Sequence, residues 1–406
     1  MLAFLVSDAG GEAAHIPLAM LIVFASAKIM AELFERFNQP GIVGEILAGI
    51  LIGPGVLGWL QPDEFLRALS DLGAMFLLFR VGLEVKASEL MAVGGTAATV
   101  AVSGVVVPFV LGWGIMTWWG ASQIEAWFTG AALVATSVGI TAQVLSAKRL
   151  LHAVASKIIL AAAVIDDVLG LLVLAVVSSV ASGKVDPAGL IMTAVLAIGF
   201  TLVVARWGTR TMSRVVPRVN ENLRVGEAQF SMAMVLLFGL ALLAVYTGVA
   251  AIVGAFLAGM ALAESTGERV HDLAHGVTEL LLPFFLVGIG LFFDPSVFSD
   301  PSNIVLAAII LVAAIVSKFV GCGLGAWRLG RADAVRVGVG MVPRGEVGMV
   351  VAQIGMGLGI LTDSTYGVVV FMAIATTMVA PPLLGVAYRG MAPAPEREQE
   401  ERFRLG

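Results

Sequence analysis

The amino-acid sequence predicts an all-α protein that crosses a membrane thirteen times, as two inverted five-helix repeats with two broken helices that cross each other. The prediction rests on the composition, on the length of the apolar runs and on motifs that recur at one offset. Hydrophobic residues make up 59% of the 406 residues and charged residues 13%, against about 25% charged in ordinary soluble domains. This composition indicates a polytopic membrane protein.

Apolar runs of roughly 20 residues, the length that spans a bilayer as a helix, are separated by charged residues or by Pro and Gly. Thirteen such segments are predicted, and we number them one to thirteen. A charged tail follows at 391–406. The segments cover residues 15–37, 40–58, 64–86, 90–118, 125–147, 152–181, 187–210, 225–247, 248–264, 272–293, 302–328, 333–358 and 364–389.

The basic residues predict the orientation of the chain, because cytoplasmic loops collect Lys and Arg. If the N-terminus is external, 18 of the 24 basic residues fall in cytoplasmic parts of the chain and only Arg67 and Lys184 fall in external parts. The others lie within the apolar segments. The sequence therefore predicts an external N-terminus and a cytoplasmic C-terminus.

Three motifs recur along the chain at almost the same offset. Segments two to six thus repeat as nine to thirteen, and a shift of seven segments reverses their direction in the membrane. Many secondary transporters use such an inverted repeat to build a binding site at the bilayer midplane. The matches are Ile42–Gly49 with Ile252–Gly259 at 210, Val81–Leu83 with Ile289–Leu291 at 208, and Thr136–Ile140 with Gly345–Met349 at 209.

Segments five and twelve are the helices predicted to break. Thr136, Ser137 and Gly139 lie in the middle of segment five, and the run from Pro343 to Glu346 interrupts segment twelve. Interrupted segments at equivalent positions of two halves point to a binding site. Arg344 and Glu346 are interpreted as structural charges, an ion pair that neutralises the half-helix ends, in preference to a direct transport role.

Two adjacent carboxylates, Asp166 and Asp167, lie in the middle of apolar segment six. Each costs roughly 2.5 to 3.5 kcal/mol at the bilayer centre, so the pair should face protein or a water-filled cavity and should have a function there. Lys318 lies about 15 Å from the cytoplasmic end of segment eleven and needs a buried partner. The repeat supplies no second copy of these charges, which predicts one site built from both halves, where protons and a metal cation compete.

Other kinds of site are excluded. Cys322 is the single cysteine, so neither an intrachain disulfide nor a cysteine metal cluster is possible. The four histidines have no zinc-site spacing, and the sequence shows no set of a nucleophile with a general base. We therefore expect that the protein is not an enzyme and needs no cofactor. The net charge of -5 argues against nucleic acid.

The order of several motifs resembles bacterial Na⁺/H⁺ antiporters of the NapA type, in the cation:proton antiporter superfamily (the monovalent cation:proton antiporter-2 branch). The resemblance covers nearly the whole chain, and the aspartate pair with the distant lysine is its most specific part. The motifs are Asn38–Pro40, Gly44–Gly49, Leu78–Phe79 with Gly82–Glu84, Ala135–Thr141, Val164–Val168 and Pro343–Gly348.

The resemblance implies the fold of the antiporter NhaA and a role for each site residue. Asp167 would be the essential cation and proton ligand, so that Na⁺ is held by Asp166 and Asp167. Asp166 would pair with Lys318 when no cation is bound. Thr136 and Ser137 would line the site.

The resemblance also implies an exchanger of Na⁺ or Li⁺ for H⁺ in the bacterial inner membrane, electrogenic and working as an elevator within a homodimer. Residues 1–86 and 225–293 would form the dimerisation domain, 90–181 and 302–389 the core that moves the ion, and 187–210 a linker helix. Two alternatives stay open: a K⁺/H⁺ antiporter of the same superfamily, and a membrane scaffold or sensor with degenerate transport residues.

Arg80 departs from the family pattern, which has an apolar residue there. It lies about 9 Å from the cytoplasmic end of segment three. Snorkelling or an i,i+4 pair with Glu84 explains it better than a role in the response to pH.

Overall fold

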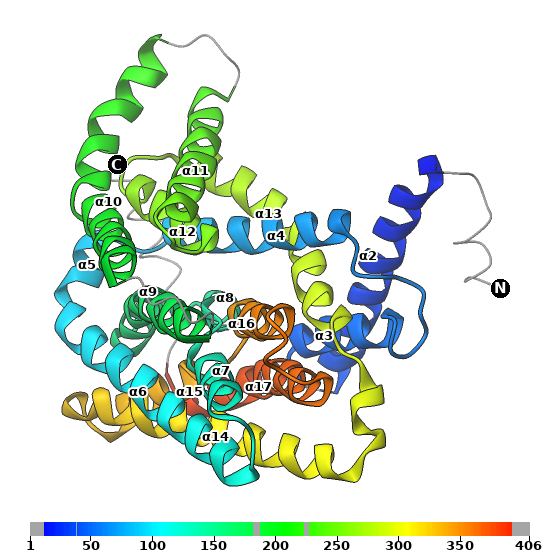
Figure 1. The fold of residues 1–406 in the computed structure, drawn as a ribbon. Coiled ribbons are helices and arrows are strands. Elements are labelled where there is room, and N and C mark those ends of the chain that lie inside the picture. Colours follow the sequence, from blue (N-terminus) through cyan, green and yellow to red (C-terminus); the bar gives the residue numbers. More distant parts are fainter. Residues whose placement is uncertain (1–11, 38, 182–186, 223–226, 392–406) are drawn as a thin grey trace.

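The computed structural model describes residues 12–37, 39–181, 187–222 and 227–391, and these residues form helices joined by short connections (Figure 1). The predicted tail at 391–406 lies outside the described residues except for its first residue, as do the first eleven residues of the chain. Nine helices of the described part are long and apolar enough to cross a membrane. The predicted class, an all-helical polytopic membrane protein, is confirmed at this level.

Each predicted segment corresponds to one helix or to two consecutive helices. Segments four, five and twelve each contain two. The α-helices are α2 Glu12–Arg36, α3 Gly41–Ile52, α4 Glu64–Leu83, α5 Ala87–Ala92, α6 Gly94–Trp119, α7 Gln123–Val134, α8 Val138–Ala147, α9 Val154–Ala181, α10 Pro187–Asn222, α11 Ala228–Tyr246, α12 Ala251–Leu262, α13 Glu268–Leu291, α14 Pro301–Gly325, α15 Arg331–Gly340, α16 Glu346–Gly357 and α17 Asp363–Ala387, with short 3₁₀ helices η1 Pro295–Ser299 and η2 Trp327–Leu329.

Several boundaries differ from the sequence prediction, and two of the differences have a clear local cause. Segment four is not one helix: α5 ends at Ala92 and α6 begins at Gly94, where two consecutive glycines weaken the helix. The helix of segment seven, α10, continues twelve residues past its predicted end at 210. Charged residues end an apolar run, but arginine is a good helix former and does not end the helix.

The helices fall into two groups by their packing (Figure 1). In the first, α4 packs against α12 and α13, α3 against α2 and α13, and α11 against α12. In the second, α6 packs against α7, α9 and α14, and α14 against α15 and α17. The long helix α10 contacts α12 of the first group and α9 of the second.

Glycines of the repeated motifs meet where helices of the first group cross. A Cβ atom added at Gly49 of α3 would lie 2.1 Å from a carbonyl oxygen of α13, and the facing residue there is Gly290. A Cβ atom at Gly82 of α4 would lie 2.2 Å from a carbonyl oxygen of α12, beside Gly259. Each crossing thus joins a motif from one half of the chain to a motif from the other half, because only residues without a Cβ permit this approach.

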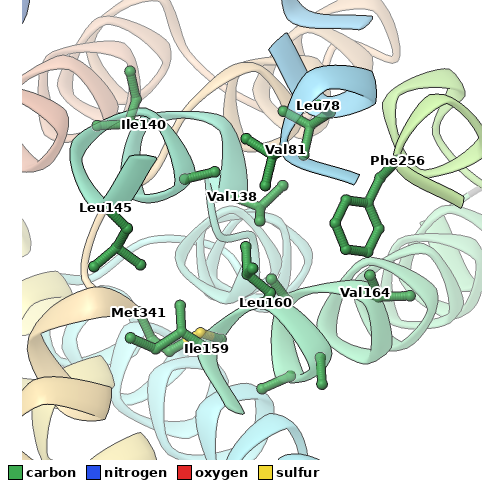
Figure 2. Packing of buried hydrophobic residues seen from close by; sticks show 14 of the residues in the cluster. Leu78, Val81, Val138, Ile140, Leu145, Ile159, Leu160, Val164, Phe256 and Met341 are labelled. Atoms are coloured by element: carbon green, nitrogen blue, oxygen red, sulfur yellow. The ribbon is translucent and has the colours of Figure 1, made fainter. Parts of the chain in front are cut away.

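The largest cluster of buried apolar side chains surrounds α9 (Figure 2). Ile159, Leu160 and Val164 of α9 lie in it with Val138 of α8 and Leu78 of α4. Close packing of this kind leaves little freedom for a side chain to shift. The helix that carries the aspartate pair is therefore held firmly by its neighbours.

Candidate functional site

The two interrupted segments meet at their breaks. Segment five is interrupted between α7 and α8, and segment twelve between α15 and α16. The backbone N–H of Ser137 donates to the carbonyl oxygen of Pro343 over 2.9 Å. A Cβ atom at Gly345 would lie 2.7 Å from Ser137 Oγ, so the two breaks are in direct contact.

The aspartate pair lies on α9, which packs against α7, α8 and α15 and so against both interrupted segments. Asp166 is 1% exposed and Asp167 is 5% exposed. The ammonium of Lys318 on α14 donates to Asp166 Oδ1 over 2.8 Å, and both side chains are fully buried. The structure thus joins residues from the two halves of the chain in one buried ion pair.

Several buried oxygens near these breaks make no hydrogen bond with the protein. Within the part of the chain that the structure describes, they include Asp166 Oδ2, Thr136 Oγ1 and Ser137 Oγ. Buried polar atoms normally have partners, and one left unsatisfied is costly, so such atoms call for an explanation. Carboxylate and hydroxyl oxygens are the ligands that hard cations prefer, and a carboxylate also accepts a proton.

Arg344 is buried beside the break in segment twelve and donates to backbone carbonyls. Its guanidinium contacts the carbonyl oxygens of Val342 at 2.9 Å, Ala314 at 3.2 Å and Met341 at 3.3 Å. The positive charge therefore lies at the carbonyls of Met341 and Val342, which follow the end of α15, where the helix dipole is negative. The side chain of Glu346, the predicted partner, lies outside the described residues.

Two threonines of α17 bind the backbone of the same break, and the sequence-based site did not include them. The N–H of Arg344 donates to Thr376 Oγ1 over 3.1 Å, and Thr377 Oγ1 donates to the carbonyl oxygen of Arg344. Thr376 follows Asp167 by 209 residues, the offset of the repeat. That correspondence was the sequence signal that could have identified Thr376, because the second half has a hydroxyl at the position where the first half has a carboxylate.

Gly104 of α6 makes room for the lysine of the ion pair. A Cβ atom there would lie 2.6 Å from Cys322 Sγ and 3.3 Å from Lys318 Nζ. Nothing in the local sequence distinguishes this glycine from others in the apolar segments.

A cavity of about 210 Å³ lies between helices of the first group and α16. Arg67, Ser70 and Asp71 of α4 and Met349 and Gln353 of α16 are among its lining residues. Met349 is four residues from Gly345, so the cavity extends from the N-terminal end of α4 towards the break in segment twelve.

Arg80 forms two long ion pairs at the other end of α4. Its guanidinium lies 3.8 Å from Glu84 and 3.7 Å from Glu279 of α13. The i,i+4 contact predicted from the sequence is present, whereas the contact with Glu279 depends on the packing of α4 against α13.

A protein-family model described as the transmembrane sodium/hydrogen exchanger matches residues 20–388. The chain belongs to this family. The family consists of secondary transporters, so this exchanger-family chain is a transporter and not an enzyme, as the sequence predicted. The predicted membership of the cation:proton antiporters is confirmed.

Relatives of this exchanger-family chain are named as antiporters. It is 35% identical to the high-affinity Na⁺/H⁺ antiporter NhaS3 of Synechocystis, over 93% of this chain and 90% of that protein. It is 33% identical to the Na⁺/H⁺-K⁺ antiporter GerN of Bacillus cereus, over 89% of this chain and 94% of that protein. The solved structure of the sodium/proton antiporter MjNhaP1 from Methanocaldococcus jannaschii has the same fold, with a TM-score of 0.66 at 17% identity over 92% of this chain and 96% of that one.

Proposed function

We propose that this protein exchanges Na⁺ or Li⁺ for H⁺ across the membrane. The observation that carries the proposal is the buried ion pair of Lys318 with Asp166, next to Asp167 and beside two helix breaks. The names of the sequence relatives support the choice of sodium and protons.

In the proposed exchange, Asp167 is the essential ligand for the cation and for the proton. Asp166 gives up its bond to Lys318 and joins Asp167 in holding Na⁺, and the hydroxyls of Thr136 and Ser137 supply further oxygens. The unsatisfied buried oxygens of Asp166, Thr136 and Ser137 support this ligand set.

We propose that the exchange is electrogenic. When a cation displaces Lys318 from Asp166, the ammonium loses its partner in a dry environment, which favours release of its proton. A second proton leaves Asp167 when the cation binds. More protons than sodium ions would then cross the membrane in each cycle.

The charges in the break of segment twelve, Arg344 and Glu346, have a structural role in this proposal. The carbonyl contacts of Arg344 support it, because they use the guanidinium at the half-helix end.

We further propose thirteen membrane crossings that include two inverted repeats, with the division into a dimerisation domain and a core domain that the NapA type has. Residues 1–86 and 225–293 form a fixed dimerisation domain, and 90–181 with 302–389 form a core that moves the site as an elevator. Helix α10, which includes 187–210, links them. The separate packing of the two helix groups and the paired glycine crossings support this arrangement.

A homodimer in the bacterial inner membrane, with the N-terminus outside and the C-terminus in the cytoplasm, completes the proposal. Lys28 lies well inside α2, pairs with Glu45 at 3.0 Å, and has a side chain 42% exposed. An exposed charge at that depth is costly against lipid, so a second copy of the chain covering α2 is favoured.

The proposal is tested in proteoliposomes with an imposed pH gradient. Adding Na⁺ or Li⁺ should collapse the gradient in the wild type, and Asp167→Asn should abolish the response. Asp363→Asn, which removes an exposed carboxylate at the start of α17, is the matched control and should keep it. A response to K⁺ with none to Na⁺ would instead assign potassium exchange, and full activity of Asp167→Asn would remove the aspartate from the mechanism.

A further inference from the structure

The break in segment twelve leaves backbone polar groups where no helix supplies partners for them. Residues 341–345, between α15 and α16, are all buried. Buried N–H and C=O groups need partners, and a chain that has left its helix must find them on neighbouring elements. The partners of this break therefore decide where its backbone lies.

Two neighbouring hydroxyls of α17 are the partners of one residue in the break. Thr376 Oγ1 accepts from the backbone N–H of Arg344 over 3.1 Å. Its own proton is donated within α17, to the carbonyl oxygen of Met372 at 2.9 Å or of Ala373 at 3.0 Å. Thr377 Oγ1 donates to the carbonyl oxygen of Arg344, and both threonines are fully buried. Helix α17 thus holds Arg344 at both of its backbone polar groups.

The residues on either side of Arg344 make the contacts that join the two breaks. The carbonyl oxygen of Pro343 accepts from the backbone N–H of Ser137 over 2.9 Å, and a Cβ atom at Gly345 would lie 2.7 Å from Ser137 Oγ. A shift of Arg344 would therefore move both of its neighbours against Ser137. Ser137 Oγ makes no hydrogen bond to a described residue, so it is available to a cation, and its position depends on this packing.

The repeat shows what a hydroxyl at this position of α17 achieves. Thr376 occupies in the second half the position that Asp167 has in the first, at the offset of 209. A carboxylate changes its charge and its bonding when it takes up a proton, whereas a hydroxyl stays neutral and can donate and accept at once. Thr376 therefore keeps the same bonds to the break whichever ion the site holds.

We infer that Thr376 and Thr377 are positioning residues for the exchange: they fix the break of segment twelve so that Ser137 Oγ stays within reach of the cation. Neither hydroxyl contacts the ion. This inference rests on the proposed function and adds α17 to the elements that build the site. Loss of either hydroxyl leaves a backbone group of Arg344 without its partner and lets the break shift. The displaced ligand lowers the affinity for the cation, which raises the half-maximal cation concentration and leaves the maximal rate nearly unchanged.

The test measures exchange at increasing Na⁺ in proteoliposomes that contain the wild type, Thr376→Val or Thr377→Val. Valine has the shape of threonine without the hydroxyl. We expect the half-maximal Na⁺ concentration to rise about three- to tenfold, the effect of losing one hydrogen bond, with the maximal rate within about twofold of the wild type. Thr376→Ser and Thr377→Ser keep the hydroxyl and should stay within about twofold of the wild type in both quantities. A threonine that only stabilised the fold would lower the amount of active protein and the maximal rate without moving the half-maximal concentration.

Thr129→Val is the matched control, because it removes another fully buried hydroxyl from the same helix group. Thr129 of α7 donates within its own helix, to the carbonyl oxygen of Glu125 over 3.0 Å. Its half-maximal Na⁺ concentration should stay within about twofold of the wild type. An equal rise in Thr129→Val would overturn the inference, as would unchanged half-maximal concentrations in the two valine variants of α17.

A second measurement separates this inference from the proposed function. The unfolding temperature of the full chain in detergent is followed with increasing Na⁺ at constant ionic strength, because a ligand of the folded state stabilises it. The two valine variants of α17 should need about three- to tenfold more Na⁺ than the wild type for the same rise in unfolding temperature, whether or not exchange is observed. If the wild type exchanges K⁺ and not Na⁺, the proposed sodium exchange is wrong, and the same comparison with K⁺ tests the positioning role. Equal cation requirements in the wild type and the valine variants would overturn the positioning role and leave the assignment of Asp167 untouched.

Discussion

Lys318 of α14 and Asp166 of α9, 152 residues apart in the chain, form an ion pair of 2.8 Å with both side chains fully buried. Two isolated charges at this depth would each be costly, but together they neutralise one another. The pair therefore ties the two halves of the chain together, and its energetics can be measured.

Removal of one member of the pair should destabilise the protein more than removal of both. Lys318→Met leaves a buried carboxylate without its counter-charge, which costs about 3 to 5 kcal/mol. The double variant Asp166→Asn/Lys318→Met leaves no isolated charge and should unfold at a higher temperature than Lys318→Met alone. Unfolding in detergent is the measurement. If the effect of the double variant equals the sum of the effects of Asp166→Asn alone and Lys318→Met alone, the pairing is contradicted.

Gly104→Ala should lower stability because its methyl group would press on the sulfur of Cys322 and on the ammonium of Lys318. Overpacking of this kind costs about 1 to 3 kcal/mol. Cys322→Ala in the same chain removes the nearer atom and should restore part of the loss. If Cys322→Ala leaves the defect of Gly104→Ala unchanged, the close approach of α6 and α14 is not its cause.

Gly82→Ala should be strongly destabilising, because the added methyl group meets a backbone oxygen of α12 that cannot rotate away. We expect a loss at or above the roughly 1 to 3 kcal/mol of ordinary overpacking. Gly239→Ala in α11 is the control: no atom lies within 4 Å of its added Cβ, so helix propensity alone should make it neutral or stabilising. Similar unfolding temperatures for the two variants would contradict the crossing.

Arg80→Leu should retain activity and lose less than about 1 kcal/mol of stability. Its two ion pairs are long, at 3.7 and 3.8 Å, and partly exposed, so screening leaves them weak. The measurement is exchange activity as a function of pH beside the wild type. A displaced pH profile would show that Arg80 takes part in regulation.

The cavity lined by Ser70 should be reachable from outside the cell in the proposed orientation. Cys322 is buried, so a Cys322→Ala background is suitable for thiol labelling. Ser70→Cys should react with a membrane-impermeant reagent added to the exterior, whereas Ser146→Cys at the end of α8 should not. Labelling of Ser146→Cys alone would reverse the orientation.

Much of the helical layout is predictable from the sequence because it depends on local pattern. Long apolar runs predict the helices, and Pro343 with Gly345 predicts an interruption where backbone groups must find other partners. The failure at segment four has a local cause, since the break at Val93 falls directly before the glycines at 94 and 95, in a run that hydropathy alone reads as continuous. The extension of α10 past 210 was missed because hydropathy does not report helix propensity.

The sequence by itself determined the membrane setting, the two interrupted segments and the candidate site residues, because a charge inside an apolar run is conspicuous whatever surrounds it. Only the tertiary structure decided the contacts: the oxygen of Asp166 that accepts from Lys318, the carbonyls that Arg344 bonds, and the glycines at which helices cross. These contacts join residues far apart in the chain. They depend on how close two helices can approach, which no local pattern specifies.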